Sequence, residues 1–172
     1  MLTDRQKDYL KKMPIEIAKK PVEIFTWNQR SLEIAADLTD KVKKADCNLE
    51  VFLVGSTPLK IAGEKDIDLT SSVSSSDFQK QTIKLEKIFG KPNKINESSV
   101  VWHIVVDNYN VGFYLVDPEK SDQLKRQLYM DNLFRKNLYL LKNYEQLKIS
   151  LHGFSHLEYT KRKFEFFNKI TK

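Results

Sequence analysis

Hydrophobic and polar positions along this chain follow two different periods. Between Phe25 and Lys44, apolar residues recur at helical spacing against charged ones, which predicts an amphipathic helix. Short apolar runs bounded by polar or turn residues instead indicate β-strands. They predict strands over residues 49–54, 66–70, 100–106 and 111–116.

The segments between and after these strands read mainly as helices and turns. Thr3 and Gln6 form a capping-box pattern at the start of a first helix. A helix is predicted from Asp77 to about Phe89, and the segment 107–110 predicts a hairpin turn. After residue 124 the chain is helical, with a break at 152–153. This order predicts an α+β fold: a small mixed sheet of about four to five strands, helices on one face, and a helical C-terminal part.

Composition places the chain among ordinary globular proteins. Of its 172 residues, 41% are hydrophobic and 30% charged, and no apolar run approaches the roughly 20 residues that a membrane span needs. Cys47 is the single cysteine, so no internal disulfide can form. The N-terminal segment lacks the apolar core of a secretory signal. We therefore expect a cytoplasmic protein without a membrane partner, with a helical extension over residues 1–20 and one domain over 21–172.

The net charge of +6 is unevenly distributed. Residues 120–172 carry 12 basic and 5 acidic side chains, whereas the preceding residues are close to balanced. Such an excess is typical of a basic face that attracts a nucleoside triphosphate or a nucleic acid. A solvated helical surface is an equally good interpretation.

The segment from Val51 to Thr70, VFLVGSTPLKIAGEKDIDLT, carries the most chemical information. Asp66 and Asp68 stand one residue apart on a predicted strand, so both carboxylates point to the same face. Two strand residues span roughly 6.5 Å, which allows both carboxylates to reach one Mg²⁺ (or Mn²⁺) ion or a close pair. These two aspartates are the predicted metal ligands and catalytic residues.

A phosphate-binding turn is predicted just before these aspartates. Gly55 permits close approach, and Ser56 reads as a helix N-cap with Pro58 in the first turn, so exposed amides there suit phosphate oxygens. Lys60 and Lys65 are possible additional phosphate contacts. Phosphate binding beside metal-binding carboxylates indicates nucleotidyl transfer. Taken singly, the glycine-serine pair is also typical of a plain turn, and the aspartates of a solvated edge strand.

These motifs resemble the signature of the nucleotidyltransferase superfamily, the fold of polymerase β, and within it the GrpB-like family. That family's strand into GST matches Val51 to Thr57, and its paired aspartates match Asp66 and Asp68. Its YExLK and YTxxKxxF elements match residues 144–148 and 159–166. The resemblance starts at about Pro21 and implies that Thr57 and Lys65 also bind the nucleotide.

The chain departs from the family pattern in three ways. Before its aspartates the family commonly has GSTxVPGLxxKP, whereas this chain has GSTPLKIAGEKD and keeps only Lys65 near the family's lysine. The strand over residues 111–116 contains no histidine where the family has them, and His103 lies on the preceding strand. Active members of the superfamily usually add a third carboxylate from a later strand, often as the catalytic base. Residues 111–116 contain no acid, which leaves Asp107 and Asp117 as candidates, although aspartates at turns and strand ends are usually structural.

Three functions are compatible with these observations. The first is an Mg²⁺-dependent nucleotidyltransferase that moves a nucleoside monophosphate from a nucleoside triphosphate to an acceptor, which the sequence leaves open as a small molecule, an RNA or a protein. The second is a catalytically inactive nucleotide-binding module of the same fold. The third is a nucleic-acid-binding protein that uses basic helices, with Lys161 and Arg162 as contacts.

Overall fold

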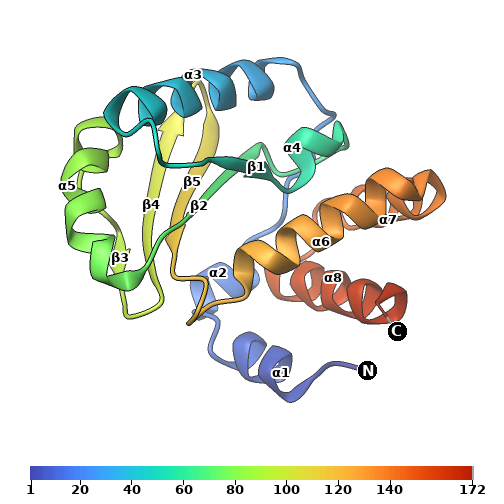
Figure 1. Cartoon of the computed structure of the whole chain (residues 1–172). Helices are drawn as coiled ribbons and strands as arrows, with labels where there is room; N and C mark the ends of the chain where they lie inside the picture. Colours follow the sequence, from blue (N-terminus) through green and yellow to red (C-terminus); the bar gives the residue numbers. More distant parts are fainter. Residues whose placement is uncertain (172) are drawn as a thin grey trace. The chain divides into compact units, whose positions relative to one another are not determined.

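In the computed structural model, which describes residues 1–171, the four predicted strands and one short strand that was not predicted, β3, form one five-stranded mixed sheet (Figure 1). The order is β1-β2-β5-β4-β3, in which β2 and β5 run parallel and the other neighbours are antiparallel. The mixed α+β architecture predicted from the sequence is thus confirmed. The strands are β1 (Phe52–Val54), β2 (Asp66–Ser72), β3 (Lys94–Ile95), β4 (Ser99–Val106) and β5 (Tyr109–Val116).

The chain divides into two compact units, each of which is described by itself. The sheet unit comprises residues 27–61 and 65–137, and the helical unit comprises residues 1–26, 62–64 and 138–172. The extension over residues 1–20 and the single domain over residues 21–172 expected from the sequence stay a prediction. No helix among the described residues is long and apolar enough to cross a bilayer.

The hydrophobic core of the sheet unit lies on one face of the sheet. Trp102 and Phe113 are fully buried there, and the Phe113 ring stacks on Phe89 with 4.7 Å between the centroids. The helices over this face are α3 (Arg30–Ala45) and α5 (Phe78–Phe89). Burying such large aromatic side chains supplies much of the free energy that holds the sheet and these helices together.

The remaining elements of the sheet unit are short or lie at its other face. The chain also forms α4 (Ser56–Leu59), a single 3₁₀ turn, η1 (Ser75–Asp77), and α6 (Gln123–Lys136). Helix α6 contacts β1 and β2, and the Thr70 hydroxyl donates to Gln127 Oε1 over 3.2 Å. Thr70 shares its face with the two aspartates of β2, so α6 borders the face that carries them.

Two local predictions can be compared directly with the structure. The hairpin between β4 and β5 is confirmed: Asp107 and Asn108 have φ values of 49° and 63°, as a two-residue hairpin loop requires. The expected start of the first long helix at Phe25 is wrong, because α3 begins at Arg30. Phe25 is instead extended and exchanges backbone hydrogen bonds with Gly63 over 2.8 and 3.0 Å.

Among the described residues, the helical unit contains four helices and the short segment over residues 62–64. The helices are α1 (Asp4–Lys11), α2 (Ile15–Lys19), α7 (Leu138–Ser150) and α8 (His156–Ile170). The predicted capping box of Thr3 and Gln6 is present at the start of α1. Tyr144 on α7 packs against Phe166 and Phe167 on α8, with ring centroids 5.4 and 5.2 Å apart. The family motifs around residues 144 and 159 therefore build the core of this unit.

Asp46, at the end of α3, makes the stability of the folded state depend on pH. Lys84 Nζ donates to its carboxylate over 2.7 Å and Gln81 Nε2 over 2.9 Å. Chiefly through the hydrogen bond from Lys84, these contacts lower the pKa of Asp46 from 3.8 to about 2. The ionised carboxylate thus stabilises the folded state, and its contribution is complete above pH 4.

We expect Asp46→Asn to lower the free energy of unfolding by about 1–2 kcal/mol at pH 7. Because the folded pKa lies below the unfolded one, the difference from the wild type should shrink as the pH falls from about 4 to 2. Urea denaturation at pH 7 and at pH 3 measures both values. Asp40→Asn, on the exposed side of the same helix, is the charge-matched control, and equal behaviour of the two variants would contradict the assignment.

Candidate functional site

Gly55 is the residue around which the candidate site is built. Its backbone, at φ 84° and ψ −149°, lies in a region that other residues rarely adopt. A Cβ atom at this position would lie 2.9 Å from Oδ2 of Asp68, which is closer than real side chains allow. The structure therefore brings the predicted phosphate-binding turn and the second predicted metal ligand into direct proximity.

The two residues after Gly55 have different environments. Gly55 is itself the N-cap of α4, and no side chain caps this helix, so the prediction that Ser56 is the N-cap is wrong. Ser56 is instead the first residue of the helix and is half-buried. Thr57 is only 4% exposed, and its hydroxyl donates to the backbone carbonyl of Asp66 over 3.1 Å. Thr57 thus ties α4 to the start of β2.

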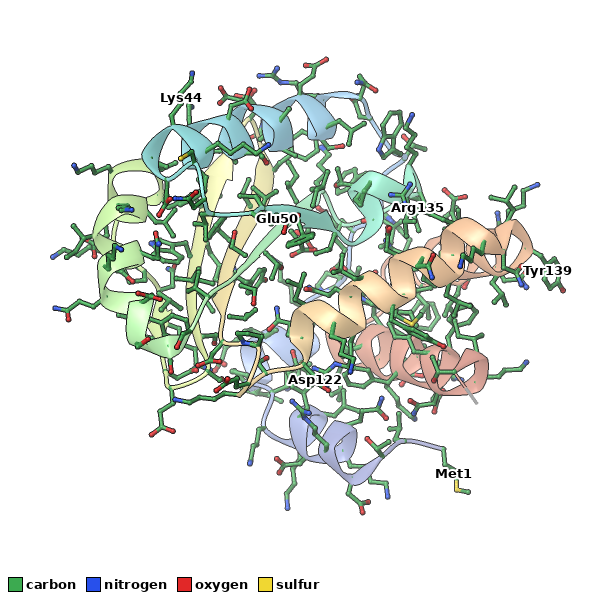
Figure 2. The ribbon with its side chains drawn as sticks, in the orientation of Figure 1. Met1, Lys44, Glu50, Asp122, Arg135 and Tyr139 are labelled. Atoms are coloured by element: carbon green, nitrogen blue, oxygen red, sulfur yellow. The ribbon has the colours of Figure 1, made fainter. Side chains whose placement is uncertain are left out.

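Further hydrogen bonds hold α4 in place from two sides. Trp27 Nε1 donates to the carbonyl of Thr57 over 3.1 Å. From the C-terminal end of α6, Arg135 Nη2 donates to the carbonyl of Pro58 over 3.2 Å, and Figure 2 shows Arg135 projecting there toward α4. Asp131, one turn earlier, accepts from Arg135 Nε over 2.6 Å and orients its guanidinium. These hydrogen bonds therefore fix the position of α4, which directly follows Gly55.

Asp66 and Asp68 lie on the same face of β2, as the period of two predicts. Both are partly exposed, whereas Ile67 and Leu69 between and after them are fully buried against the core. Asp68 pairs with Val54 of β1 on one side, and β5 runs along the other side of β2. The two carboxylates consequently face solvent from the middle of the sheet.

The neighbouring strand β5 presents no carboxylate to this pair. Asn110 is the register partner of Asp66, and its Nδ2 donates to Asp66 Oδ1 over 3.1 Å. Gly112 is the partner of Asp68, and the Tyr114 ring lies over it, with the hydroxyl 2.8 Å from where a Cβ would be. An amide and an aromatic ring thus stand where a further acid would face the pair.

The two candidates for a third acid are both held elsewhere. Asp107 lies in the hairpin turn and forms an ion pair with Arg30. Asp117, just beyond the far end of β5, is buried and accepts from the backbone amides of Ser75 and Glu119 over 2.8 and 2.9 Å. Hydrogen bonding, chiefly from Ser75, lowers the pKa of Asp117 below its ordinary value. Both side chains therefore have structural roles in the sheet unit.

The residues present fit one divalent cation. Asp66 and Asp68 offer two carboxylates on one face, and the missing side chain of Gly55 leaves the Asp68 carboxylate its space. Magnesium commonly takes one or two carboxylates and completes its shell with water and phosphate oxygens. Among residues 1–171 no group of three or more histidine, cysteine or acidic side chains is arranged to hold a metal ion.

Lys60 and Lys65, the two lysines predicted to contact phosphate, have different surroundings in the structure. Lys60 Nζ lies over the Trp27 ring, 5.6 Å from its centroid. Lys65 has a left-handed backbone, φ 59°, and its carbonyl accepts from the Asn110 amide over 3.0 Å. Lys65 thus stands directly beside Asp66, whereas Lys60, at the C-terminal end of α4, makes a cation–π contact with Trp27.

Some basic side chains of the C-terminal third form ion pairs with nearby acids, although the excess of basic over acidic residues remains. On α8, Arg162 contacts Glu158 over 2.7 Å, and Lys161 Nζ lies 4.0 Å from the same residue. On α6, Arg126 contacts Asp122 over 2.7 Å. The side chains on which the nucleic-acid hypothesis depends are therefore partly paired with acids of their own helices.

Asn110 is the residue of the site that sequence reasoning missed. The predicted strand began at residue 111, whereas β5 begins at Tyr109, so Asn110 was assigned to the turn. The available signal was its position two residues before Gly112, because residues two apart on one strand lie on the same face of the sheet. Register with β2, across 44 positions in the sequence, is what places its amide against Asp66.

Comparisons with known proteins give the family and the fold of the chain. The family model described as GrpB protein matches residues 21–172. The crystal structure of the conserved protein GrpB from Enterococcus faecalis superimposes with a TM-score of 0.67 at 18% identity, covering 87% of this chain and 99% of that one. A search among curated proteins found no match.

A second similar structure is that of a polymerase. The Cid1 poly(U) polymerase, in a crystal structure with MgGTP bound, gives a TM-score of 0.50 at 11% identity. The match covers 80% of this chain but only 45% of the Cid1 chain, so this protein spans less than half of that polymerase. At such identities the likeness concerns the fold alone.

Proposed function

The chain belongs to the GrpB family, and from this premise we propose that it is a nucleotidyltransferase that moves a nucleoside monophosphate from a nucleoside triphosphate to an acceptor. In this reaction an acceptor oxygen attacks the α-phosphorus. The bond from the α-phosphorus to the bridging oxygen breaks, and its electron pair leaves with pyrophosphate. Positioning and charge neutralisation supply most of the catalysis in such transfers.

Each part of the site has one role in this proposal. Asp66 and Asp68 hold a divalent cation, Mg²⁺ or Mn²⁺, which when bound neutralises charge on the phosphates. Gly55 and Ser56 receive the β- and γ-phosphates, with Lys65 beside them as a cationic contact. Thr57 supports this turn, since its hydroxyl is bonded to the Asp66 carbonyl.

The observation that carries the proposal is the proximity of Gly55 and Asp68. A side chain on Gly55 would collide with the Asp68 carboxylate, so the turn proposed to bind phosphate and a carboxylate proposed to bind metal lie next to each other. A triphosphate that bridges the two would place its reacting phosphorus beside the carboxylate pair. An ordinary turn before an ordinary edge strand would not require this arrangement.

Release of pyrophosphate tests the proposal. The full-length protein is incubated with each of the four ribonucleoside triphosphates, and pyrophosphate is measured with Mg²⁺, with Mn²⁺ and with excess chelator. We expect release that depends on the cation and is lost in Asp66→Asn. Equal nucleotide binding by the wild type and this variant, with and without metal, would contradict the assignment of the metal site.

An inactive nucleotide-binding module is the second candidate function. It is favoured by Asn110 and Tyr114 on β5, because neither side chain supplies the acid that active members of the superfamily carry. This function predicts saturable binding of a nucleoside triphosphate without pyrophosphate release under any of the conditions above. Labelling of any acceptor by α-³²P-labelled nucleotide would rule it out.

A further inference from the structure

We propose that Asn110 limits the site to one divalent cation and thereby selects an acceptor whose attacking oxygen is already ionised. This inference rests on the proposed function for its second half. The first half, the number of cations, concerns only the residues of β2 and β5. The two halves can therefore fail separately.

The side-chain amide of Asn110 lies beside the Asp66 carboxylate, on the neighbouring strand β5. Its Nδ2 lies 3.1 Å from Asp66 Oδ1, and the two residues are register partners across the parallel strands. An ionised carboxylate only accepts hydrogen bonds, so the amide nitrogen, not the oxygen, faces it. A donor in this position occupies one acceptor site of Asp66 and offers no negative charge to a cation.

The number of ligand atoms then restricts the capacity of the site. Two cations in one nucleotidyl-transfer site stand about 3.5–4 Å apart and need oxygen ligands that they share. Asp66 and Asp68 are the two carboxylates that β2 carries on this face, and β5 adds none. Because Asp66 Oδ1 already accepts a hydrogen bond from Asn110, fewer carboxylate oxygens remain to bridge a second cation.

The position opposite Asp68 cannot supply the missing acid. Gly112 occupies it, and any Cβ there would lie 2.8 Å from the Tyr114 hydroxyl and 3.0 Å from the ring. His103, the next residue across the sheet, is a further strand away and makes an edge contact with the Tyr114 ring at 6.0 Å. Two strand spacings, roughly 10 Å, separate it from Asp68. Asn110 is thus the residue that sets the capacity.

The class of acceptor follows from whether the site contains a group that can take a proton from it. A neutral hydroxyl must lose its proton when it attacks phosphorus, and a carboxamide such as Asn110 cannot accept it. An ionised phosphate or carboxylate oxygen attacks without losing a proton. The new oxygen–phosphorus bond forms as pyrophosphate leaves with the electron pair of the broken bond, and no proton changes place. The site is therefore suited to an oxyanion acceptor.

Counting bound cations tests the first half without any turnover. Mn²⁺ is titrated by electron paramagnetic resonance in the presence of a non-hydrolysable nucleoside triphosphate. We expect one tightly bound ion per chain in the wild type and two in Asn110→Asp. Asn110→Ala and Asn108→Asp, the latter a matched exchange in the hairpin turn, should both keep one ion.

A second readout guards against misfolding of the acidic variant. Asp66 and a carboxylate at position 110 would lie directly opposite each other, so metal-free Asn110→Asp should melt at a lower temperature than Asn108→Asp. Mn²⁺ should raise its melting temperature more than it raises that of the wild type. Two ions in the wild type, or one ion in folded Asn110→Asp, would overturn the role of Asn110.

Acceptor competition tests the second half. Pyrophosphate release is measured with Mg²⁺-nucleotide and either inorganic phosphate or acetate, and separately with glycerol or ribose. We expect at least tenfold faster release with the oxyanions in the wild type, and a shift toward the hydroxyl compounds in Asn110→Asp. Faster release with hydroxyl compounds in the wild type would overturn this half. No release with any acceptor would overturn the proposed function and this half together, while the Mn²⁺ count still decides the role of Asn110.

Discussion

Asp68→Asn is expected to lower cation-dependent pyrophosphate release by about 10³-fold or more, because it removes one of only two carboxylates offered to the cation. Asp68 is the carboxylate nearest to Gly55, so its loss also separates the cation from the bound phosphates. The side chain is partly exposed, and an amide has almost the same shape. The fold should therefore survive.

Three measurements make this prediction specific. Initial rates of pyrophosphate release give the activity, Mn²⁺ titration gives the metal affinity, and thermal melting reports the fold. Asp77→Asn, an exposed aspartate before α5 in the same unit, makes the same charge change away from the site. Activity of Asp68→Asn within tenfold of the wild type would remove Asp68 from the metal site.

Gly55→Ala is expected to reduce pyrophosphate release by about 10²-fold and stability by about 1–3 kcal/mol. Two causes act together. The backbone at φ 84° is strained for any other residue, and the new methyl group would press on Asp68 Oδ2 from 2.9 Å. Relief of this contact moves either the turn or the carboxylate, and both displacements disturb the alignment of phosphate and cation.

Gly90→Ala separates these two causes. Gly90 follows α5 with φ 75° and ψ −163°, so alanine is strained there in a similar way, but a Cβ at Gly90 would have no atom within 4 Å. We expect Gly90→Ala to lose comparable stability and to keep its activity. The comparison uses chemical denaturation and initial rates. If both variants lose activity equally, backbone strain and not the Asp68 contact explains the effect.

Secondary structure was predictable wherever the pattern is local. The hairpin of β4 and β5, the capping box of α1, and the stop of α5 at Gly90 all follow from neighbouring residues. Helix α3 was predicted too long because Phe25 has helical periodicity but forms backbone hydrogen bonds with Gly63. A partner 38 positions away outweighs local preference, and periodicity does not reveal it.

In the candidate site, too, local features could be predicted from the sequence and contacts between distant segments could not. The spacing of Asp66 and Asp68 by itself determines that they share a face, since alternation is a property of the strand. That Asp107 and Asp117 serve other contacts could be suspected from their turn positions, but only Arg30 and Ser75 show it. These partners come from elements distant in the sequence.

The sequence alone determined most of the elements, the family resemblance, and the positions of the glycine and the paired aspartates. The tertiary structure decided which groups face that pair: the Gly55 backbone on one side, and Asn110 and Tyr114 on the other. The physical reason is that periodicity arises from each segment's own geometry, whereas the register of β2 with β5 is fixed by burying Ile67, Leu69, Val111 and Phe113 on one common face.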